Sequence, residues 1–440
     1  MKDPTIKNDY QKKGRATLNK QIFDVMLITE KQQLLLDNSD VTEFYFIEDI
    51  FKFCLTGTMT FNDRYNLVEY GPFTGNERIA LIYSVGDDRE RELVFDIWKV
   101  NRIQGIGTGM REGSENLITM QFVDPFFTGL NLRKYSRSWS GEYYSDIMQD
   151  ILNNMCFFKA TSSPFNIEKS SNKTDFIMPF WKPQVAMRWL MRRAKGKQSG
   201  SSGYLCYNST KENLSHNLHT MNYLLQDQDK SLDPIKYVFQ DGEVSGENKI
   251  LEWWISGIDR TSLSSIRGGR WRGYDFSTKK LLNYDYVYSE GADNTTCLGR
   301  KTLYKQIDDL YSTSRMVGEN DYKKLENVAY NDWAKRYNLQ FIMNIIVQGH
   351  EKRYAGQHIQ IDWPSSKKNV GADPSNALLK GRYLIKSVTH SFSAGGTFPY
   401  KQRLVLIKNA YNDIDSKILY KAKKPNVFSD PKQNVQLVRK

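Results

Sequence analysis

The stretch Val41–Tyr83, VTEFYFIEDIFKFCLTGTMTFNDRYNLVEYGPFTGNERIALIY, decides the fold class of this chain. It contains β-type runs, with turn-forming residues between the last two: Glu43–Asp49, Phe53–Asn62 and Glu77–Tyr83. In the second run apolar residues alternate with threonines, so we expect one buried strand face. Gly57 lies inside this run, where glycine usually marks a bulge or a close backbone approach. Because the stretch offers no nucleophile, base or metal cluster, it predicts a β-barrel or sandwich wall and a partner surface.

The composition is that of a globular, β-rich protein. A chain of 440 residues has room for about two to four domains. Aromatic residues make up 13% of it, which favours β-structure and contact surfaces. The formal charge of +12 is moderate and favours solubility and complementarity to an acidic neighbour. Basic residues are dense only at Arg188–Lys197 and Lys417–Lys424, and the sequence leaves open whether these are solvated or phosphate-facing.

The cysteines and the N-terminal segment indicate the compartment. Cys54, Cys156, Cys206 and Cys297 are widely spaced and lie in or beside apolar runs. We therefore expect buried thiols in a reducing compartment and neither a disulfide frame nor a zinc site. The segment Met1–Lys20 is polar, and no apolar run approaches membrane-spanning length. The expectation is a soluble protein made in a cytoplasm, without stable membrane insertion.

The N-terminal part is predicted to form an arm over residues 1–16 and one antiparallel β-domain, a closed or half-closed barrel, over residues 17–133. Further strands are expected at Phe23–Thr29, Glu92–Ile103 and Glu115–Val123. The glycines of Gly105–Gly109 superficially resemble a dinucleotide-binding loop. Because no helix follows them, we interpret the segment as the tip of a long hairpin.

Residues 134–203 predict an α/β insertion domain. Ser140 is a candidate helix cap, and a second helix is expected from Pro183 to Ala194. The buried face of the first helix would consist of Tyr144, Ile147, Ile151, Leu152 and Met155. The segment Gly196–Gly203, GKQSGSSG, is predicted to be a flexible linker or loop, and it lacks the spacing of a nucleotide-binding Walker motif.

The C-terminal half returns to β-structure. Short strands are expected at Tyr204–Tyr207 and Ile235–Phe239, followed by an aromatic-rich region with a helix over Asn320–Tyr337. The block Leu339–Asn409 is again all β. Residues 412–440 are polar and basic and lack periodicity, so we interpret them as a tail that orders, if at all, on a partner.

Two stretches carry a resemblance to one family. The first is Ile50–Ile82, with its Leu55-Thr56-Gly57 strand, the Asp63–Asn66 turn, and the pairs Gly71-Pro72 and Gly75-x-Glu77. The second is Ile345–Asn409, with Val347-x-Gly349, Gly356, Ile359-x-Ile361 and the run from Gly381 to His390. Together they resemble the two tube-type barrels of baseplate central hub proteins from contractile-tailed bacteriophages. Spike-hub proteins of type VI secretion machines share that architecture.

The resemblance implies a mainly β fold with two tail-tube-like antiparallel β-barrel domains and inserted α/β lobes. The second barrel would be discontinuous, combining residues 204–246 with 338–411 around an inserted aromatic-rich lobe over residues 247–337. It further implies a homotrimer whose paired barrels form a pseudo-sixfold ring, joining the tail tube to the central spike and passing DNA through its lumen.

The same resemblance implies the partners and the location. The partners would be the central spike protein, tail-tube or tube-initiator proteins, the tape-measure protein and the surrounding baseplate wedge. The protein would lie in the tail baseplate of a virion assembled in the host cytoplasm, and no enzymatic activity, cofactor or metal is expected. Candidate interface residues are Leu55, Gly57, Met59, Phe61, Trp253, Trp254, Tyr383, Ile385 and Val388.

Two other functional classes remain as alternatives. A β-scaffold enzyme that cleaves peptidoglycan or another glycan would need two carboxylates across a cleft. Acidic residues such as Asp49, Asp63 and Glu77 are plentiful, but they are better explained as turn formers and interface polar groups. A nucleic-acid binder would need a focused basic and aromatic groove, which the scattered charges do not indicate. The pair His216-x-x-His219 near Cys206 lacks the fourth ligand and tighter spacing of a structural zinc site.

Overall fold

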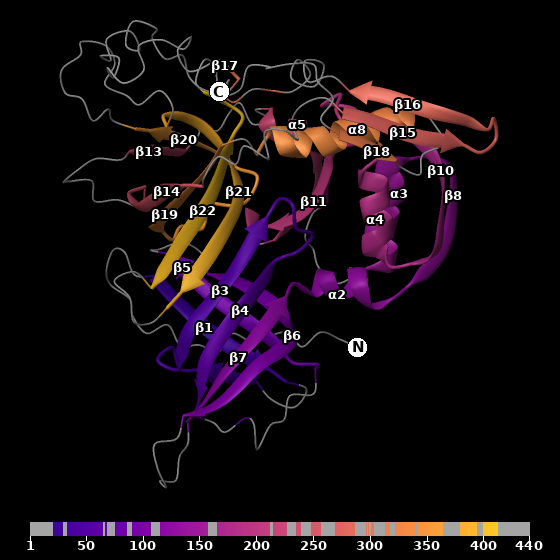
Figure 1. Ribbon diagram of the computed structural model, residues 1–440. Helices are drawn as coiled ribbons and strands as arrows, with labels where there is room; N and C mark the ends of the chain where they lie inside the picture. The colour runs from indigo at the N-terminus through magenta and orange to yellow at the C-terminus, as the bar shows by residue number, and fades with distance from the viewer. Residues whose placement is uncertain are drawn as a thin grey trace, which may run out of the picture.

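The computed structural model describes residues 21–29, 33–64, 67, 75–85, 90–106, 115–156, 165–211, 214–226, 235–238, 248–256, 269–286, 296, 298, 301–302, 313–316, 322–339, 341–363, 379–393 and 399–411. The described chain is mainly β, and a large, predominantly antiparallel sheet dominates it, with helices gathered to one side (Figure 1). The predicted N-terminal arm, the C-terminal tail, Cys297 and the Gly107–Gly109 part of the hairpin tip lie outside the described residues.

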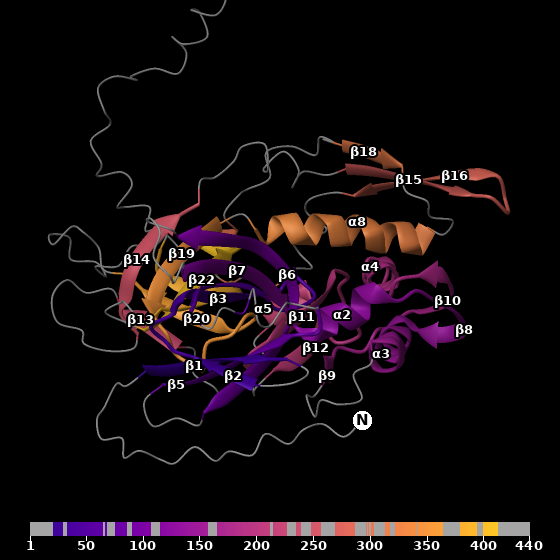
Figure 2. The same cartoon turned by 90° about the horizontal axis from the view of Figure 1, so that it is seen from below.

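The N-terminal strands form one half of the large sheet. They are β1 (Gln21–Ile28), β2 (Gln33–Leu36), β3 (Val41–Asp49), β4 (Thr56–Asp63), β5 (Arg78–Val85), β6 (Arg91–Ile106) and β7 (Glu115–Val123). Their order is β3-β4-β7-β6-β5-β1-β2, all antiparallel, and the sheet curls around an apolar core (Figure 2). Alternate residues of β4 from Gly57 to Asp63 are buried, as the sequence predicted. The β6–β7 hairpin is also confirmed.

The C-terminal strands form the other half. They are β13 (Ile235–Val238), β14 (Ile250–Ile255), β19 (Phe341–Gln348), β20 (His358–Asp362), β21 (Gly381–Phe392) and β22 (Tyr400–Lys408). The order β14-β19-β22-β21 continues directly into β3, while β20 pairs with the first residues of β21 and β13 pairs with β20. These strands enclose a second apolar core. We refer to the two halves as the first and the second barrel.

Strand β21 belongs to both barrels. Its first residues, up to Leu384, pair with β20, whereas its last residues, from Ser387 to Phe392, pair with β3. The change of partner occurs at an irregularity between Ile385 and Ser387. There the backbone carbonyl of Lys386 accepts a hydrogen bond from the Ile50 amide at 3.0 Å, and its ammonium lies 2.8 Å from Asp49. One hydrogen-bonded sheet therefore runs through both barrels.

The insertion consists of helices and short sheets. Its elements are α2 (Pro125–Leu132), β8 (Tyr135–Tyr143), α3 (Tyr144–Met155), β9 (Phe165–Ile167), β10 (Lys173–Trp181), α4 (Pro183–Met191), β11 (Tyr204–Ser209), β12 (Ser215–Thr220) and α5 (Met221–Leu225). The predicted buried face of α3 is confirmed. The prediction that Ser140 caps this helix is wrong, because Ser140 lies within β8 and its hydroxyl donates to Asp175 on the neighbouring β10.

The GKQSGSSG segment is a packed loop. Ser199, Ser201 and Ser202 are buried, and the carboxylate of Glu168 organises the turn. That carboxylate accepts hydrogen bonds from the Ser199 amide at 3.0 Å and from the amide and hydroxyl of Thr220 at 2.9 and 2.8 Å. The composition suggested a flexible linker or loop; the structure has a loop, which this buried acid holds against β12.

The aromatic-rich lobe lies next to the insertion. It contains the sheet β16-β15-β18, made of β15 (Gly269–Asp275), β16 (Lys280–Tyr286) and β18 (Thr313–Met316), and the helix α8 (Tyr322–Tyr337). Two further short strands, β17 (Lys301–Thr302) and β23 (Ala410–Tyr411), pair with each other. Figure 2 shows α8 between this sheet and α4, and its apolar stripe packs on Trp271. The predicted helix is thus confirmed over Tyr322–Tyr337.

The strand pairing differs from the predicted domain boundaries in two places. The sequence interpretation assigned residues 204–246 to the second barrel, but β11 pairs with β12, which pairs with β9 of the insertion. It assigned residues from 247 onwards to the lobe, but β14 pairs with β19 in the second barrel. Strands β13 and β14 both join this sheet from earlier in the chain.

Candidate functional site: an exposed strand edge and a buried barrel junction

Most of the candidate interface residues have their side chains covered by their own chain. Leu55, Met59, Phe61, Tyr383, Ile385 and Val388 are at most 1% exposed, and Gly57 is also buried. They fill the cores of the two barrels, where alternation along β4 and β21 places them. These side chains therefore offer no surface to another subunit. Among the candidate residues, only Trp253 and Trp254 have side chains exposed enough to contact one.

Strand β14 presents these two tryptophans at an edge of the large sheet. Trp253, Trp254 and Ile255 are 40%, 37% and 37% exposed, and β14 pairs on one side only, with β19, in the described part of the chain. The Trp253 ring meets Trp363 edge-on, with centroids 4.7 Å apart. The guanidinium of Arg403 lies 4.8 Å from the centre of the Trp254 ring. An edge strand with ordered, exposed aromatic residues is suited to pairing with another chain.

Gly57 permits a close approach inside the first barrel. A Cβ atom at this position would overlap the Phe122 ring and the carbonyl oxygen of Tyr45. The register shift between β3 and β4 lies elsewhere, between Val41 and Glu43. A glycine inside a strand can mark either a bulge or a close approach. At Gly57 the structure shows a close approach and no bulge.

A buried polar network joins the two barrels. The carboxylate of Glu48, on β3, accepts hydrogen bonds from the Thr210 amide at 3.2 Å and hydroxyl at 2.6 Å, and from the Ala355 amide at 3.0 Å. Its Oε1 also lies 2.7 Å from Nε2 of His390, on β21. Glu48 and His390 are at most 1% exposed. One carboxylate thus connects the first barrel, the second barrel and the end of β11.

The network has a defined direction. The Gln402 amide is oriented by the backbone of His350, because its oxygen accepts from the His350 amide and its nitrogen donates to the His350 carbonyl. The same nitrogen donates to the Tyr400 hydroxyl at 2.8 Å. When His390 is neutral, the hydroxyl proton points to its Nδ1, 2.7 Å away, and its Nε2 donates to Glu48. Burial raises the pKa of Tyr400 well above its ordinary value.

A chain of Glu, His and Tyr is also a common catalytic arrangement, but this one is sealed. Tyr400 is 2% exposed and Gln402 is 0% exposed, so a substrate has no path to these atoms in the described structure. A second connection between the barrels lies beside it, where Arg91 of β6 pairs with Glu351 at 3.1 Å and donates to the Thr210 carbonyl. We conclude that the junction fixes the two barrels relative to one another.

The sequence interpretation missed this junction, although one signal was present. Phe44, Phe46 and Glu48 alternate along β3 and are all fully buried, so a charged residue stands on an otherwise apolar strand face. Such a residue needs buried partners. Its partners come from β21, from the end of β11 and from the loop before β20, and no pattern in the sequence connects those positions.

The two candidate metal-ligating histidines point to different surroundings. His216 lies 2.7 Å from the Asn208 side chain and packs between Phe126 and Phe165, whereas His219 stacks on Tyr223. Burial lowers the pKa of both imidazoles to about 4. Within the described residues there is no group of three or more His, Cys, Asp or Glu side chains that could hold a metal ion. Cys54, Cys156 and Cys206 are buried free thiols, as predicted.

The acidic residues considered for an enzyme serve local structure. Asp49 accepts from the Phe51 amide, Asp63 from the Leu67 amide and Glu77 from the Gly75 amide, which sits at φ +95°. These are the turn-forming roles that the sequence predicted. None of the helices in the described ranges is long and apolar enough to span a membrane.

The fold is similar to that of phage tail proteins. A tail protein from Neisseria meningitidis MC58 matches with a TM-score of 0.54 and 10% identity, over 88% of this chain and 97% of that chain. The 43 kDa tail protein of prophage MuSo2 from Shewanella oneidensis matches with a TM-score of 0.50 and 9% identity, over 88% and 98%. A chain of the half-lidded Francisella PdpA–VgrG complex matches with a TM-score of 0.50 and 12% identity, over 91% and 60%. No protein-family model and no curated protein matches the sequence.

These likenesses define the class of fold. The chain has the mainly β fold of phage tail proteins, over nearly the full length of two of them. The expected architecture of β-barrels with inserted helical lobes is therefore confirmed. Because sequence identity is so low, the comparisons establish the fold, and the role of the chain has to be argued from its surfaces.

Proposed function

We propose that the protein is a non-enzymatic hub of a phage tail baseplate that assembles into a homotrimeric ring. The observation that carries the proposal is the exposed edge of β14, where Trp253 and Trp254 stand at one end of a sheet that runs through both barrels. The other end of that sheet is β2, which pairs only with β1 among the described strands. The likeness to phage tail proteins supports the same role.

The two sheet ends are suited to a head-to-tail contact. When one surface of a subunit binds a different surface of the next, the contact closes into a ring if the rotation allows it. Two barrels in each of three subunits would give a ring with six similar lobes, which matches a sixfold tube on one side and a threefold spike on the other. In this proposal DNA passes through the lumen, and tape-measure and wedge proteins contact the assembly in the virion.

The oligomeric state tests the proposal. A stable ring contact buries more than about 2,000 Å² with an apolar centre, so the purified protein, alone or co-expressed with a spike protein, should have a trimeric mass by light scattering. The double substitution Trp253→Ser, Trp254→Ser should shift the protein to monomer. The matched control is Phe276→Ser, which alters an aromatic side chain that is 79% exposed in the lobe, and it should remain trimeric. A wild-type protein that stays monomeric in both settings would contradict the proposal.

A further inference from the structure

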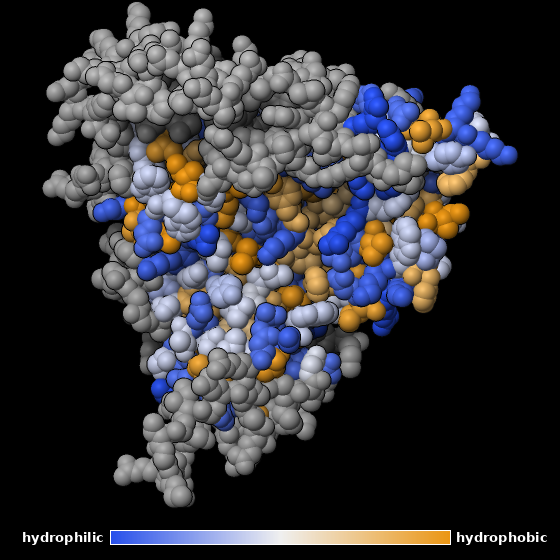
Figure 3. Space-filling model, in the orientation of Figure 1, coloured by the Kyte–Doolittle hydropathy of each residue, from blue (hydrophilic) through white to orange (hydrophobic). Residues whose placement is uncertain are grey.

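A cavity lies where four parts of the molecule meet. It has a volume of about 280 Å³ and is lined by the segment after β3, by α4, by β11 and by α8. In the space-filling view, hydrophobic surface lies between the barrel strands and α4 (Figure 3). The apolar lining consists of Ile50, Phe51, Phe53, Met191, Leu205 and Cys206. A cavity at the lower limit of ligand-pocket size holds one or two side chains, and it is too small for a large cofactor.

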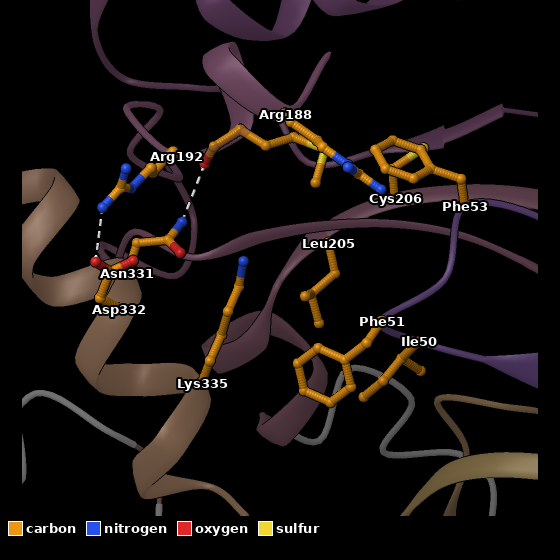
Figure 4. A pocket seen from close by; sticks show the side chains of 11 residues that line it. Ile50, Phe51, Phe53, Arg188, Arg192, Leu205, Cys206, Asn331, Asp332 and Lys335 are labelled. Atoms are coloured by element: carbon orange, nitrogen blue, oxygen red, sulfur yellow. Dashed lines mark hydrogen bonds and ion pairs between the residues drawn. The ribbon is translucent and has the colours of Figure 1, made fainter. Parts of the chain in front are cut away.

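The polar part of the lining is strongly basic. Arg188, Arg192 and Lys335 line the cavity together with a single carboxylate, that of Asp332. Arg192 uses one guanidinium nitrogen for Asp332 at 2.7 Å, whereas its Nε is buried and has no hydrogen-bond partner among the described residues. The side chain of Lys335 reaches into the cavity between Asn331 and Leu205 (Figure 4). The cavity therefore contains more positive charge than its own carboxylate balances.

Among the basic side chains of the cavity, Lys335 is affected most by this excess of positive charge. Its ammonium forms no hydrogen bond and no ion pair within the described part of the chain. Burial lowers the pKa of Lys335 despite the nearby Asp332 carboxylate, and the Arg192 guanidinium acts in the same direction as burial. An anion bound between Lys335 and Arg192 would supply the missing partner for both.

We propose that this cavity binds an acidic segment of a partner protein, with one carboxylate between Lys335 and Arg192 and a neighbouring apolar side chain against Phe51 and Leu205. Charge complementarity selects an anion, and the apolar half of the lining selects a peptide over a free inorganic ion. The site is complete in one chain, so binding does not depend on ring formation and extends beyond the proposed hub role.

The test uses the full chain and a defined probe. The probe is a fluorescein-labelled, C-terminally amidated peptide Gly-Leu-Glu-Phe-Gly, and binding is followed by fluorescence anisotropy at low salt. We expect the peptide to bind the wild-type protein and to bind about tenfold more weakly when glutamine replaces its glutamate. Lys335→Gln should weaken binding of the glutamate peptide by a similar factor, and Lys335→Arg should retain most of it.

The controls separate this site from general attraction to a basic protein. Lys323→Gln removes a charge from an exposed position on the same helix and should leave binding unchanged. A circular-dichroism melt shows whether Lys335→Gln folds, and Lys335→Arg provides a second reading if it does not. Equal binding of both peptides, no effect of Lys335→Gln in a folded protein, or no binding up to about 1 mM would overturn the proposal. Sodium phosphate that binds with the same Lys335 dependence, while the peptide does not, would show an inorganic-anion site instead.

Discussion

Glu48 makes many of the hydrogen bonds at the junction between the barrels, because every acceptor site on its carboxylate is used. Replacing it with glutamine turns one acceptor oxygen into a donor, which must then face the His390 N–H or the Thr210 and Ala355 amides. We expect Glu48→Gln to lower the free energy of unfolding by about 3 kcal/mol, as when one partner of a buried charged contact is lost. Urea denaturation measures it.

The same strand provides the control for this substitution. Glu43 is exposed on β3, so Glu43→Gln should change the free energy of unfolding by less than about 0.5 kcal/mol. Equal losses in the two variants would show that the buried network contributes no more than a surface charge does.

A second prediction at the scale of one residue concerns Gly57. Its missing side chain lets the Phe122 ring and the Tyr45 carbonyl approach the strand, and the ring is itself fully buried. We expect Gly57→Ala to lower the free energy of unfolding by about 1–3 kcal/mol, because the added methyl group overpacks the core. The companion variant Gly57→Ala, Phe122→Leu should recover part of the loss, and a neutral Gly57→Ala would refute the close-packing interpretation.

At the scale of an element, β12 makes stability depend on pH. Burial lowers the pKa of His219 to about 4, whereas in the unfolded chain it is near 6.5. Below pH 6.5 the unfolded state therefore binds the proton more readily, and stability falls as the pH drops from 6.5 towards 4. Between pH 7 and pH 5 this residue should cost the protein about 2 kcal/mol.

His219→Phe tests the contribution of that residue. Phenylalanine keeps the ring stacked on Tyr223 and removes the titration. The variant should lose less stability than the wild type between pH 7 and pH 5, measured by urea denaturation at both values. Asp124 acts in the opposite direction in both proteins, because burial raises its pKa to about 6 and protonation then favours the folded state. An unchanged pH slope would count against the assignment.

The elements were predictable where the local pattern is strong. The alternation in β4, the apolar face of α3 and the proline that starts α4 all follow from periodicity and backbone preference. The helix start at Ser140 failed because β8 carries no strand pattern of its own, and its burial pattern is almost entirely exposed. It is a strand because it pairs with β10, which follows about thirty residues later in the chain.

At the scale of the whole molecule, the shared strand couples the barrels. Phe392 belongs to β21 and yet packs in the first barrel, stacked on Tyr400 with ring centroids 4.4 Å apart. We therefore expect both barrels to unfold in a single calorimetric transition. Phe392→Ala should lower the midpoint of that transition by about 5 °C or more without splitting it, since a large core cavity costs about 3–5 kcal/mol.

The exposed residue Phe276 serves as the control for this substitution. Phe276→Ala removes a ring that lies outside the core, so its midpoint should stay at the wild-type value. Two separate transitions in the wild-type protein, or a Phe392→Ala protein in which only one barrel melts early, would disprove the coupling.

The sequence could supply the two barrel blocks and the exposed tryptophans, but not how the barrels connect. Leu55, Tyr383 and Val388 are apolar and regularly spaced, which would suit a contact surface as well as a core, and the structure buries them in the cores. Periodicity shows which strand face is buried, but it does not show which part of the chain, or which other subunit, covers that face. The partner of β21 changes at Lys386, and this change depends on contacts with residues more than three hundred positions away.

The strand that both barrels share also limits where the chain can be truncated. Because β21 completes both barrels, a truncated protein that keeps residues 21–133 alone would lack the strand that covers β3 and would expose its amides and carbonyls to solvent. Such a fragment should aggregate when expressed by itself. A synthetic peptide that spans Ser387–Phe392 and the flanking residues should restore the solubility of the fragment by donor-strand complementation, because it can pair with β3 in place of β21.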